Sequence, residues 1–363
     1  MNCSTKDRME RSVEAAVRGF AVRGASRIMS RITSKFTLMF ELPFALVLLP
    51  VFALVFALAH AANVAAQSYP VKPIRIIVGF APAGAADVVI RVVAQGLSTQ
   101  MGQSVVVDNR PGADSTIAAE AVAKAPADGY TLFLGSNTAL VAVPTSRATP
   151  YDPFADFTPI SNLGRFTMFL AASPNVPASN VRELIDYARS RPGQLNYATS
   201  NSAAHLATVQ LLAPSKLEMT HVRYKGDAQA INDLMTDRIQ IMWATGTGVP
   251  PLAKEGKLRV LATLLDSRSP LLPDVPTAKE AGLQRLTIVP WAALFAPARL
   301  APELTARLSR EVATALKRAD VREQLDRQGF EPSASTSDEL AQFHRLQHDN
   351  WTRTVREQNI KFD

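Results

Sequence analysis

Cysteine and catalytic motifs are almost absent from the sequence. Cys3 is the single cysteine of 363 residues, and it lies in an N-terminal segment that we expect to be removed on export. The mature chain would then have no disulfide, thiol nucleophile or cysteine metal site. No G-x-S-x-G, H-E-x-x-H, G-x-x-x-x-G-K-[ST] or G-x-G-x-x-G motif occurs. The sequence therefore gives little support for catalysis or for a bound cofactor or metal.

Blocks of positive charge are also missing once the N-terminal segment is set aside. The whole chain has a formal net charge of +7, but residues 1–66 hold 8 of its 39 Lys and Arg and only 4 of its 32 Asp and Glu. The remainder has a net charge of +3, with no Lys/Arg run and no alternation of basic and aromatic residues. We therefore expect no nucleic acid as a partner.

Residues 44–59 form the one long uncharged apolar run, which follows Arg31 and Lys35. Small residues at Val64, Ala65 and Ala66 suit a signal peptidase, so the pattern predicts cleavage after Ala66 and export to the periplasm. The alternative is a retained membrane anchor, for which sixteen residues are few. Met29 would give the signal a more ordinary length.

After residue 69 the hydrophobic pattern alternates between strands and helices. Strands are expected at 74–80, 104–109 and 130–135, with helices at 89–101 and 116–124 between them. A second series follows residue 165, with helices at 181–190 and from Ser202 and Asp227, and strands at 195–199, 220–224, 239–243 and 258–264. Asn180 and Glu183 fit a capping box at the first of these helices. The pattern predicts an α/β fold with two lobes, each a mostly parallel sheet flanked by helices.

The C-terminal region has two amphipathic segments, 302–328 and 337–358, which need a surface to cover. The first series has too few helices for both faces of its sheet, so we expect these segments to return to it. This predicts a signal segment at 1–66, a discontinuous first lobe at 67–166 and 290–363, and a second lobe at 167–289. The two crossings, near 165–168 and 289–291, would form a hinge.

The strand-to-helix joins are the candidate ligand site, because helix N-termini at the carboxyl ends of strands bind anions. "GFAPAGAAD", "GSNTAL", "TSNSAAHL" and "YKGDA" supply small residues, hydroxyls and amides at such joins. The candidate ligand-binding residues are Phe80, Pro82, Ala83, Gly84, Ala85, Ala86, Asp87, Ser136, Asn137, Thr138, Thr199, Ser200, Asn201, Ser202, Ala203, His205, Tyr224, Lys225, Gly226, Trp243, Ala244 and Thr245.

Several of these residues have a second interpretation. Asp87 suits the N-cap of the following helix better than direct ligand contact. His205 could pack or cap as well as shape the pocket, and Trp243 could be a buried strand residue instead of a cleft wall. His344 and His348 are spaced as a metal pair, but an exposed helical face is the commoner reason for that spacing.

Over residues 69–357 the sequence resembles the tripartite tricarboxylate transporter substrate-binding proteins, also called the Bug family. The stretches that carry the resemblance are "IRIIVGFAPAGAAD", "NRPGADSTIAAEAVAKAPADGYTLFLGS", "HVRYKG", "SRSPLLPDVPTAKEAGL" and "LFAPARLAPE". The resemblance implies a two-lobed periplasmic-binding-protein fold of type II that closes on a small carboxylate. It also implies a receptor that serves a membrane permease of the tripartite type, or a sensor without one. We expect the protein to be a monomer.

The sequence departs from the family pattern where the ligand is expected. Residues 82–87 have one glycine where the family usually has two or three, and the loop at 199–204 has none. Ala244 and Thr245 stand where the family often has an aspartate, and Arg223 stands where it often has a proline. We expect a receptor. The alternative is a periplasmic hydrolase or isomerase on the same fold, with His205 or Asp87 as its base.

Overall fold

The computed structural model describes residues 69–246, 248–284, 286, 288 and 290–357. The chain divides into two compact units, residues 1–69 and 70–363, and the second contains all the helices and strands described below. The expected signal segment and its cleavage site lie outside the described residues. None of the described helices combines the length and apolar character needed to cross a membrane.

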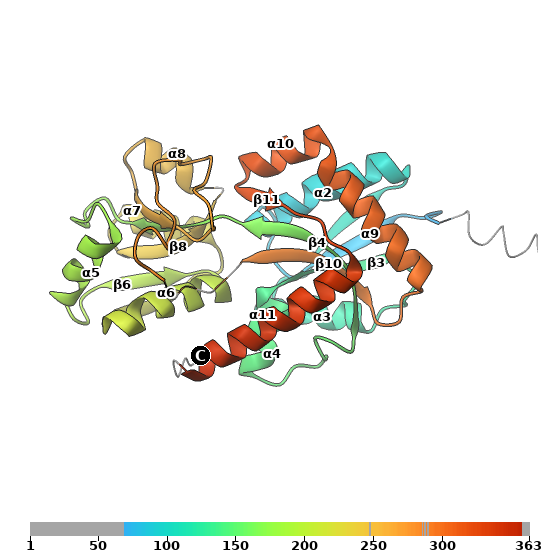
Figure 1. Ribbon diagram of the computed structural model, residues 1–363, viewed down its shortest axis with the longest axis horizontal. Helices are drawn as coiled ribbons and strands as arrows, with labels where there is room; N and C mark the ends of the chain where they lie inside the picture. Colours follow the sequence, from blue (N-terminus) through green and yellow to red (C-terminus); the bar gives the residue numbers. More distant parts are fainter. Residues whose placement is uncertain (1–68, 247, 285, 287, 289, 358–363) are drawn as a thin grey trace, which may run out of the picture. The chain divides into compact units, whose positions relative to one another are not determined.

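The first lobe is built around a six-stranded sheet with the order β11-β4-β10-β3-β1-β2 (Figure 1). β1 is parallel to β2 and β3, whereas β10 is antiparallel to β3 and β4, and β11 is antiparallel to β4. The strands are β1 (Ile74–Val78), β2 (Val105–Asn109), β3 (Thr131–Ser136), β4 (Phe157–Phe166), β10 (Trp291–Pro297) and β11 (Phe330–Pro332).

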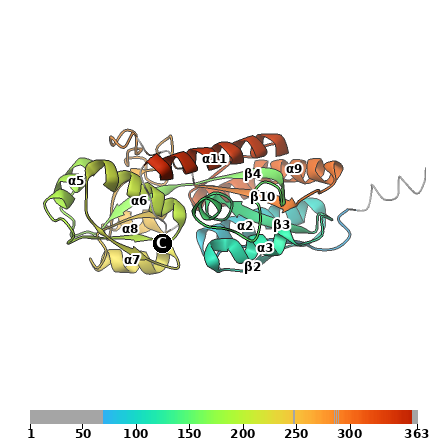
Figure 2. The same cartoon turned by 90° about the horizontal axis from the view of Figure 1, so that it is seen from below.

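Helices cover both faces of this sheet (Figures 1 and 2). One group packs together on one face: α2 (Ala85–Met101), α9 (Pro302–Lys317) and α10 (Ala319–Arg327). The other face carries α3 (Thr116–Ala123), the π-helical turn η2 (Thr138–Ala142), α4 (Val143–Ser146) and α11 (Ser337–Glu357). Because α9 and α11 both contact β4, the C-terminal part of the chain packs on the sheet that begins at β1.

The second lobe has a five-stranded sheet with the order β7-β6-β8-β5-β9. Its strands are β5 (Met168–Ala172), β6 (Asn196–Thr199), β7 (Thr220–Arg223), β8 (Ile241–Thr245) and β9 (Arg259–Thr263). α5 (Val181–Arg189) and α6 (Ser202–Ser215) cover one face, and α7 (Asp227–Met235) and α8 (Val249–Lys254) cover the other. The predicted N-cap is confirmed, because Asn180 Oδ1 accepts from Glu183 N at 3.0 Å. Glu183 Oε2 accepts from Ser179 N at 2.7 Å, one residue before the N-cap position of a standard capping box.

The two-lobed α/β fold is confirmed, but the expectation of mostly parallel sheets was wrong. Both sheets are mixed, because the crossing strands run antiparallel to their neighbours. β4 and β5 are separated only by Thr167. The crossing is fixed by backbone bonds from Phe166 N to Pro290 O at 2.8 Å and from Thr167 N to Gly329 O at 2.7 Å. The connection between the lobes is therefore short and supported on both sides.

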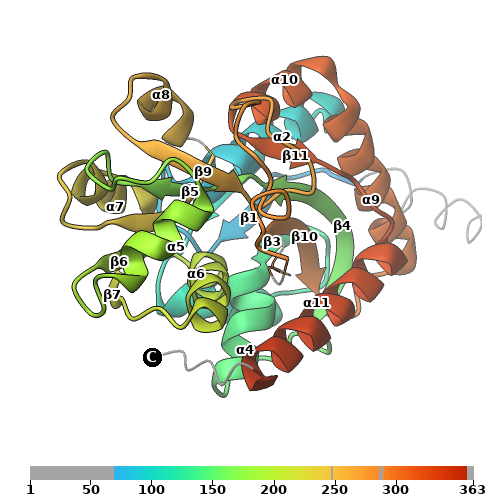
Figure 3. The ribbon, with the colours of Figure 1, turned by 60° about the vertical axis from the view of Figure 1, so that its left-hand side comes forward.

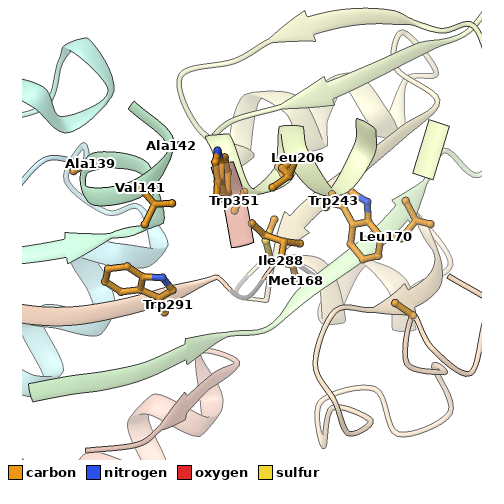
Figure 4. Packing of buried hydrophobic residues seen from close by; sticks show 14 of the residues in the cluster. Ala139, Val141, Ala142, Met168, Leu170, Leu206, Trp243, Ile288, Trp291 and Trp351 are labelled. Atoms are coloured by element: carbon orange, nitrogen blue, oxygen red, sulfur yellow. The ribbon is translucent and has the colours of Figure 1, made fainter. Parts of the chain in front are cut away.

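One cluster of buried apolar side chains contains residues from both lobes (Figure 4). It includes Trp291 of β10, Met168 of β5, Leu206 of α6 and Trp351 of α11. Each of these side chains is at most 4% exposed. The cluster thus continues from the six-stranded lobe into the five-stranded lobe.

The amphipathic segment at 302–328 forms two helices. Arg318 has φ −63° and ψ 135°, which is an extended conformation, and α9 ends before it. α10 begins at Ala319 with Arg318 as its N-cap. The large apolar residues are four positions apart up to Leu316, and the next one, Val321, is five positions further on, so the break lies where the helical spacing is interrupted.

Candidate functional site

A cavity of about 420 Å³ lies between the two lobes. The starts of three helices border it: Gly84 and Ala85 at α2, Asn201 at α6, and Asp227 at α7. Fifteen of the candidate residues line it: Phe80, Pro82, Ala83, Gly84, Ala85, Ala86, Ser136, Asn137, Thr138, Ser200, Asn201, Ala203, Lys225, Gly226 and Thr245.

The loop between β1 and α2 forms a tight turn at the cavity wall. Gly84 N donates to Ala81 O at 3.4 Å, and Ala83 has φ 63°, so the turn is of type II with Pro82 at its second position. Ala83, rather than the glycine, therefore takes the left-handed conformation. Gly84 has φ −74°, which does not require glycine. The missing side chain matters because a Cβ there would lie 3.3 Å from Ala81 O.

Asp87 is neither the N-cap of α2 nor part of the cavity wall, so the preferred interpretation was wrong. Gly84 is the N-cap, and Asp87 is the third residue of the helix. Its side chain is 3% exposed and accepts bonds from Ala83 N (2.9 Å), Arg91 Nε (2.9 Å) and Asn109 Nδ2 (2.8 Å). Burial alone would raise the pKa of Asp87, but these hydrogen bonds and the charge of Arg91 outweigh it, and the pKa lies below its usual value. Asp87 therefore holds the loop between β1 and α2 in place through its bond to Ala83 N.

The joins at α6 and α7 are connected through the Asp227 carboxylate. Oδ2 accepts from Thr245 N at 2.8 Å and from Thr245 Oγ1, and Oδ1 accepts from Ser200 Oγ. Asn201 caps α6, because its Oδ1 accepts from Ala204 N at 2.9 Å. Since three short segments share these bonds, the second-lobe wall has a defined shape.

Ser136 and Asn137, at the end of β3, have different roles at the cavity. Asn137 Oδ1 accepts from Trp291 N at 2.9 Å, which links β3 to the second crossing. Ser136 is 8% exposed, and its hydroxyl has no hydrogen-bond partner among the described residues. A buried hydroxyl without a partner is costly, so Ser136 Oγ is suited to a ligand acceptor.

The remaining seven candidates lie elsewhere. Thr199, Ser202 and His205 line a smaller cavity of about 190 Å³, which shares Asn201 with the larger one. Asp87, Tyr224, Trp243 and Ala244 line neither cavity.

Packing explains the last three of these. Trp243 and Ala244 are fully buried in the core, because both faces of β8 are covered by helices. The Tyr224 hydroxyl donates to Asp233 Oδ2 at 2.7 Å, which holds the ring on α7. The cleft-wall interpretation of Trp243 was therefore wrong, and the buried-strand alternative is correct.

Sequence reasoning missed most of the apolar wall. The additional residues of the larger cavity are Ala81, Leu134, Phe166, Met168, Asp227, Ala228, Ile231, Gly248, Pro290, Trp291 and Ala292. Phe166, Met168 and Trp291 flank the two crossings. These three residues could have been predicted from the expected positions of the crossings, because a connection between two lobes passes the back of the cleft.

The interpretation of His344 and His348 as an exposed face was wrong for His344, which is 2% exposed. Its ring lies 4.6 Å from that of Phe154, and its Nε2 bonds to Leu140 O at 3.0 Å. Burial is the main reason that the pKa of His344 falls to about 4. Among the described residues, no group of three or more His, Cys, Asp or Glu could hold a metal ion.

Two α/β lobes with a cavity between them, lined by helix starts, define the class of periplasmic solute-binding proteins. Residues 89–360 match the model of the tripartite tricarboxylate transporter family receptor, TctC. The chain belongs to this family and is a solute receptor, not an enzyme.

Relatives support this assignment over most of the chain. Protein BugT of Bordetella pertussis (strain Tohama I) is 35% identical over 83% of this chain and 94% of its own length. The structure of R. palustris Rpa4515 with adipate matches with a TM-score of 0.74 and 32% identity, over 81% of this chain and 99% of that one. MatC from Rhodopseudomonas palustris, with bound malate, matches with a TM-score of 0.71 and 30% identity, over 79% and 100%.

Proposed function

We propose that the chain is a periplasmic receptor that captures a small organic acid in the larger cavity. The observation that carries this proposal is the convergence of the starts of α2, α6 and α7 on one cavity between the lobes. The first N–H groups of a helix lack partners within the helix, and the helix dipole is positive at that end. Such ends stabilise a carboxylate, and three of them at one cavity favour an anion over a neutral solute.

The side chains of the cavity fit the same ligand. Lys225 adds a positive charge, and Ser136 adds a hydroxyl without a partner among the described residues. Asp227 is the acidic residue of the wall, and its carboxylate is occupied by Ser200 and Thr245. Leu134, Phe166, Met168 and Ile231 would contact the carbon chain of the ligand. Each charge-assisted hydrogen bond to the carboxylate contributes about 1.5–3 kcal/mol.

We assign the lobes to residues 67–166 with 290–363 and to residues 167–289, with the hinge at the two crossings. The composition of the two sheets supports these boundaries, because β5 to β9 form one sheet and the other strands form the second. Ligand that contacts both walls would favour the closed arrangement.

Export and a permease partner complete the proposal. The apolar run at 44–59 followed by small residues supports cleavage after Ala66, and the similar solved structures include one described as a periplasmic transporter. The family description supports delivery of the ligand to a tripartite membrane permease. We expect the receptor itself to be a monomer.

A melting experiment with a panel of mono-, di-, tri- and aromatic carboxylates tests the ligand class. A ligand at 100 times its Kd stabilises the folded state by about 2.7 kcal/mol, which raises the Tm of a chain of this size by about 4 °C. We expect at least one carboxylate to give this shift. If none does while neutral sugars or amines do, the ligand class is wrong.

The variant Gly84→Val tests whether the ligand carboxylate binds beside the loop at the start of α2. The backbone of Gly84 suits valine, but the added methyl groups would fill the space beside the loop, so binding should fall at least tenfold while the fold persists. Ala306→Val, on the exposed surface of α9, is the matched control and should bind normally. If Gly84→Val folds and binds with full affinity, the carboxylate does not bind beside this loop.

A further inference from the structure

The helical segment after β3 contributes to both cavities. Asn137 and Thr138, at its start, line the larger cavity, and Ala142 and Arg147, near its end, line the smaller one. The segment begins as η2 and continues as α4, and η2 contacts α6 of the second lobe. The backbone register of η2 therefore decides which of its side chains face the ligand.

η2 is wider than an α-helix. Val143 N donates to Thr138 O, five residues back, whereas Arg147 N donates to Val143 O, four residues back, at 3.0 Å. The spacing of the backbone bonds thus changes within a few residues. Such π-helical turns are rare and are found frequently at functional sites, so the origin of this one is of interest.

A proline leaves the wide turn short of a backbone donor. Residue 144 is proline, which has no N–H. The missing N–H is the one that would serve Ala139 O in the five-residue spacing, or Leu140 O in the four-residue spacing. Ala139 and Leu140 are fully buried. A buried carbonyl without a donor is costly, so these two oxygens need donors from outside the helix.

Two buried side chains supply the donors. Tyr151 Oη donates to Ala139 O at 2.6 Å, and His344 Nε2 donates to Leu140 O at 3.0 Å. Tyr151 precedes β4, and His344 belongs to α11, which packs along η2 and α4 (Figures 1 and 3). Tyr151 is 5% exposed and His344 is 2% exposed, and neither lines one of the two cavities. They therefore act on the cavity wall through the backbone of η2.

Both donors have the protonation state that these bonds need. Burial raises the pKa of Tyr151 to about 12 and lowers the pKa of His344 to about 4. Near pH 7 the phenol thus keeps its proton and the imidazole is neutral. Because a carbonyl oxygen only accepts, Nε2 is the nitrogen that carries the proton of the neutral ring.

A different register would change the cavity wall. In the four-residue spacing Val143 N would bond to Ala139 O, which in this structure accepts from Tyr151. The residues before the turn would then rotate by about 100°, the angle between successive residues of an α-helix. This rotation would move Thr138 out of the wall of the larger cavity.

We infer that Tyr151 and His344 are positioning residues of the ligand site. Their hydrogen bonds hold η2 in its five-residue register, and this register keeps Asn137 and Thr138 in the wall of the larger cavity. The inference rests on the proposed function of that cavity. It extends the ligand site to two side chains that the ligand does not touch.

Tyr151→Phe tests the inference, because it removes the hydroxyl and keeps the ring, whose centroid lies 5.7 Å from that of Phe157. Calorimetry measures the binding of adipate, malate and any other acid that raises the Tm in the carboxylate panel. We expect Tyr151→Phe to bind at least tenfold more weakly than the wild type. Tyr130→Phe is the matched control, since the Tyr130 hydroxyl accepts from Val71 N at 3.0 Å in the same lobe. This control should bind normally.

Amide hydrogen exchange of the ligand-free proteins separates positioning from general stability. In Tyr151→Phe, peptides that cover residues 138–146 should exchange faster than in the wild type, because η2 is no longer held in one register. Peptides from β1 and β10 should keep their wild-type rates. A side chain that only stabilised the fold would change the exchange of the whole lobe.

His344 provides a second pair of variants. His344→Leu removes the donor to Leu140 O, whereas His344→Gln keeps one. We expect His344→Leu to weaken binding at least tenfold and His344→Gln to weaken it less. If Tyr151→Phe does not fold, this pair decides the inference, because the two variants share a position and differ in the donor.

The outcomes separate this inference from the function on which it rests. Wild-type affinity in folded Tyr151→Phe or in folded His344→Leu would overturn the inference alone. Weaker binding together with faster exchange throughout the lobe would do the same, because the side chains would then only stabilise the fold. A wild type that binds none of the acids would overturn the inference together with the organic-acid function.

Discussion

Single buried polar side chains hold the loops of the site, and His344 is one of them. Its imidazole bonds to Leu140 O of η2. The same turn contributes Thr138 to the larger cavity and Ala142 to the smaller one. Burial lowers the pKa of His344 to about 4. As the pH falls below about 6.5 the unfolded histidine takes up a proton, whereas the folded one stays neutral until about pH 4. The folded protein should therefore lose about 3 kcal/mol of stability across this window.

Urea unfolding of the wild type and of His344→Gln at several pH values measures this effect. Glutamine keeps a donor for Leu140 O but does not titrate. The difference in stability between the two proteins should change by about 3 kcal/mol between pH 7 and pH 4. A constant difference over this range would show that His344 is not held neutral by burial.

Asp87 gives the second residue-scale prediction. Asparagine has one acceptor oxygen, so Asp87→Asn cannot serve Ala83 N, Arg91 and Asn109 together. We expect a loss of about 2 kcal/mol of stability, together with weaker ligand binding because the loop behind the cavity is loosened. Asp108→Asn breaks a more exposed pair with Arg110 and should cost under about 1 kcal/mol. Equal effects in urea unfolding would contradict the role assigned to Asp87.

At the scale of elements, the type II turn before α2 combines function with strain. Ala83 has a left-handed conformation that suits glycine, so Ala83→Gly relieves strain at this position, partly offset by a more flexible unfolded chain. We expect stability to rise by up to about 1 kcal/mol. Ala306→Gly in α9 is the opposite control and should cost about 1 kcal/mol. Thermal unfolding of both variants measures whether stability rises or falls. A lower stability of Ala83→Gly would contradict the proposal that Ala83 is strained.

Elements and joins with local signals could be predicted from the sequence. The joins that follow apolar runs were predicted, and they line the larger cavity. They are the small residues of 82–86, and Asn201 and Gly226 before helices. β4 and β10 were not predicted as strands, and Phe166, Met168 and Trp291 were missed as wall residues. Apolar residues have the same pattern in a core and at a cleft, so only the packing of distant segments separates these cases.

The remaining misses depend on contacts between segments far apart in the chain. Asp114, Arg147 and Arg223 line the smaller cavity from three segments, and each is an ordinary surface residue by its local sequence. His344 is buried because rings from earlier parts of the chain, those of Phe154, Trp291 and Phe295, pack against it. Local patterns could not show either arrangement.

At the scale of the whole molecule, the two lobes should close further around a ligand. The pair between Asp114 and Arg223 joins the lobes, but Arg223 is 58% exposed, and such pairs contribute at most about 1 kcal/mol. Without ligand, that pair alone should not prevent the lobes from separating about the crossings at Thr167 and Pro290. A ligand that contacts both walls adds free energy only to the closed arrangement and should shift the population toward it.

Small-angle scattering with and without a saturating carboxylate measures this shift. The radius of gyration of the wild type should decrease on binding, because the lobes rotate toward each other about the two crossings. Gly84→Val is the control at a ligand concentration that fills the wild type but lies below the Kd of the variant, where the radius of the variant should stay near the value of the free protein. A wild-type radius that does not change at saturation would mean that the lobes are already closed without ligand, or that the acid contacts one lobe only.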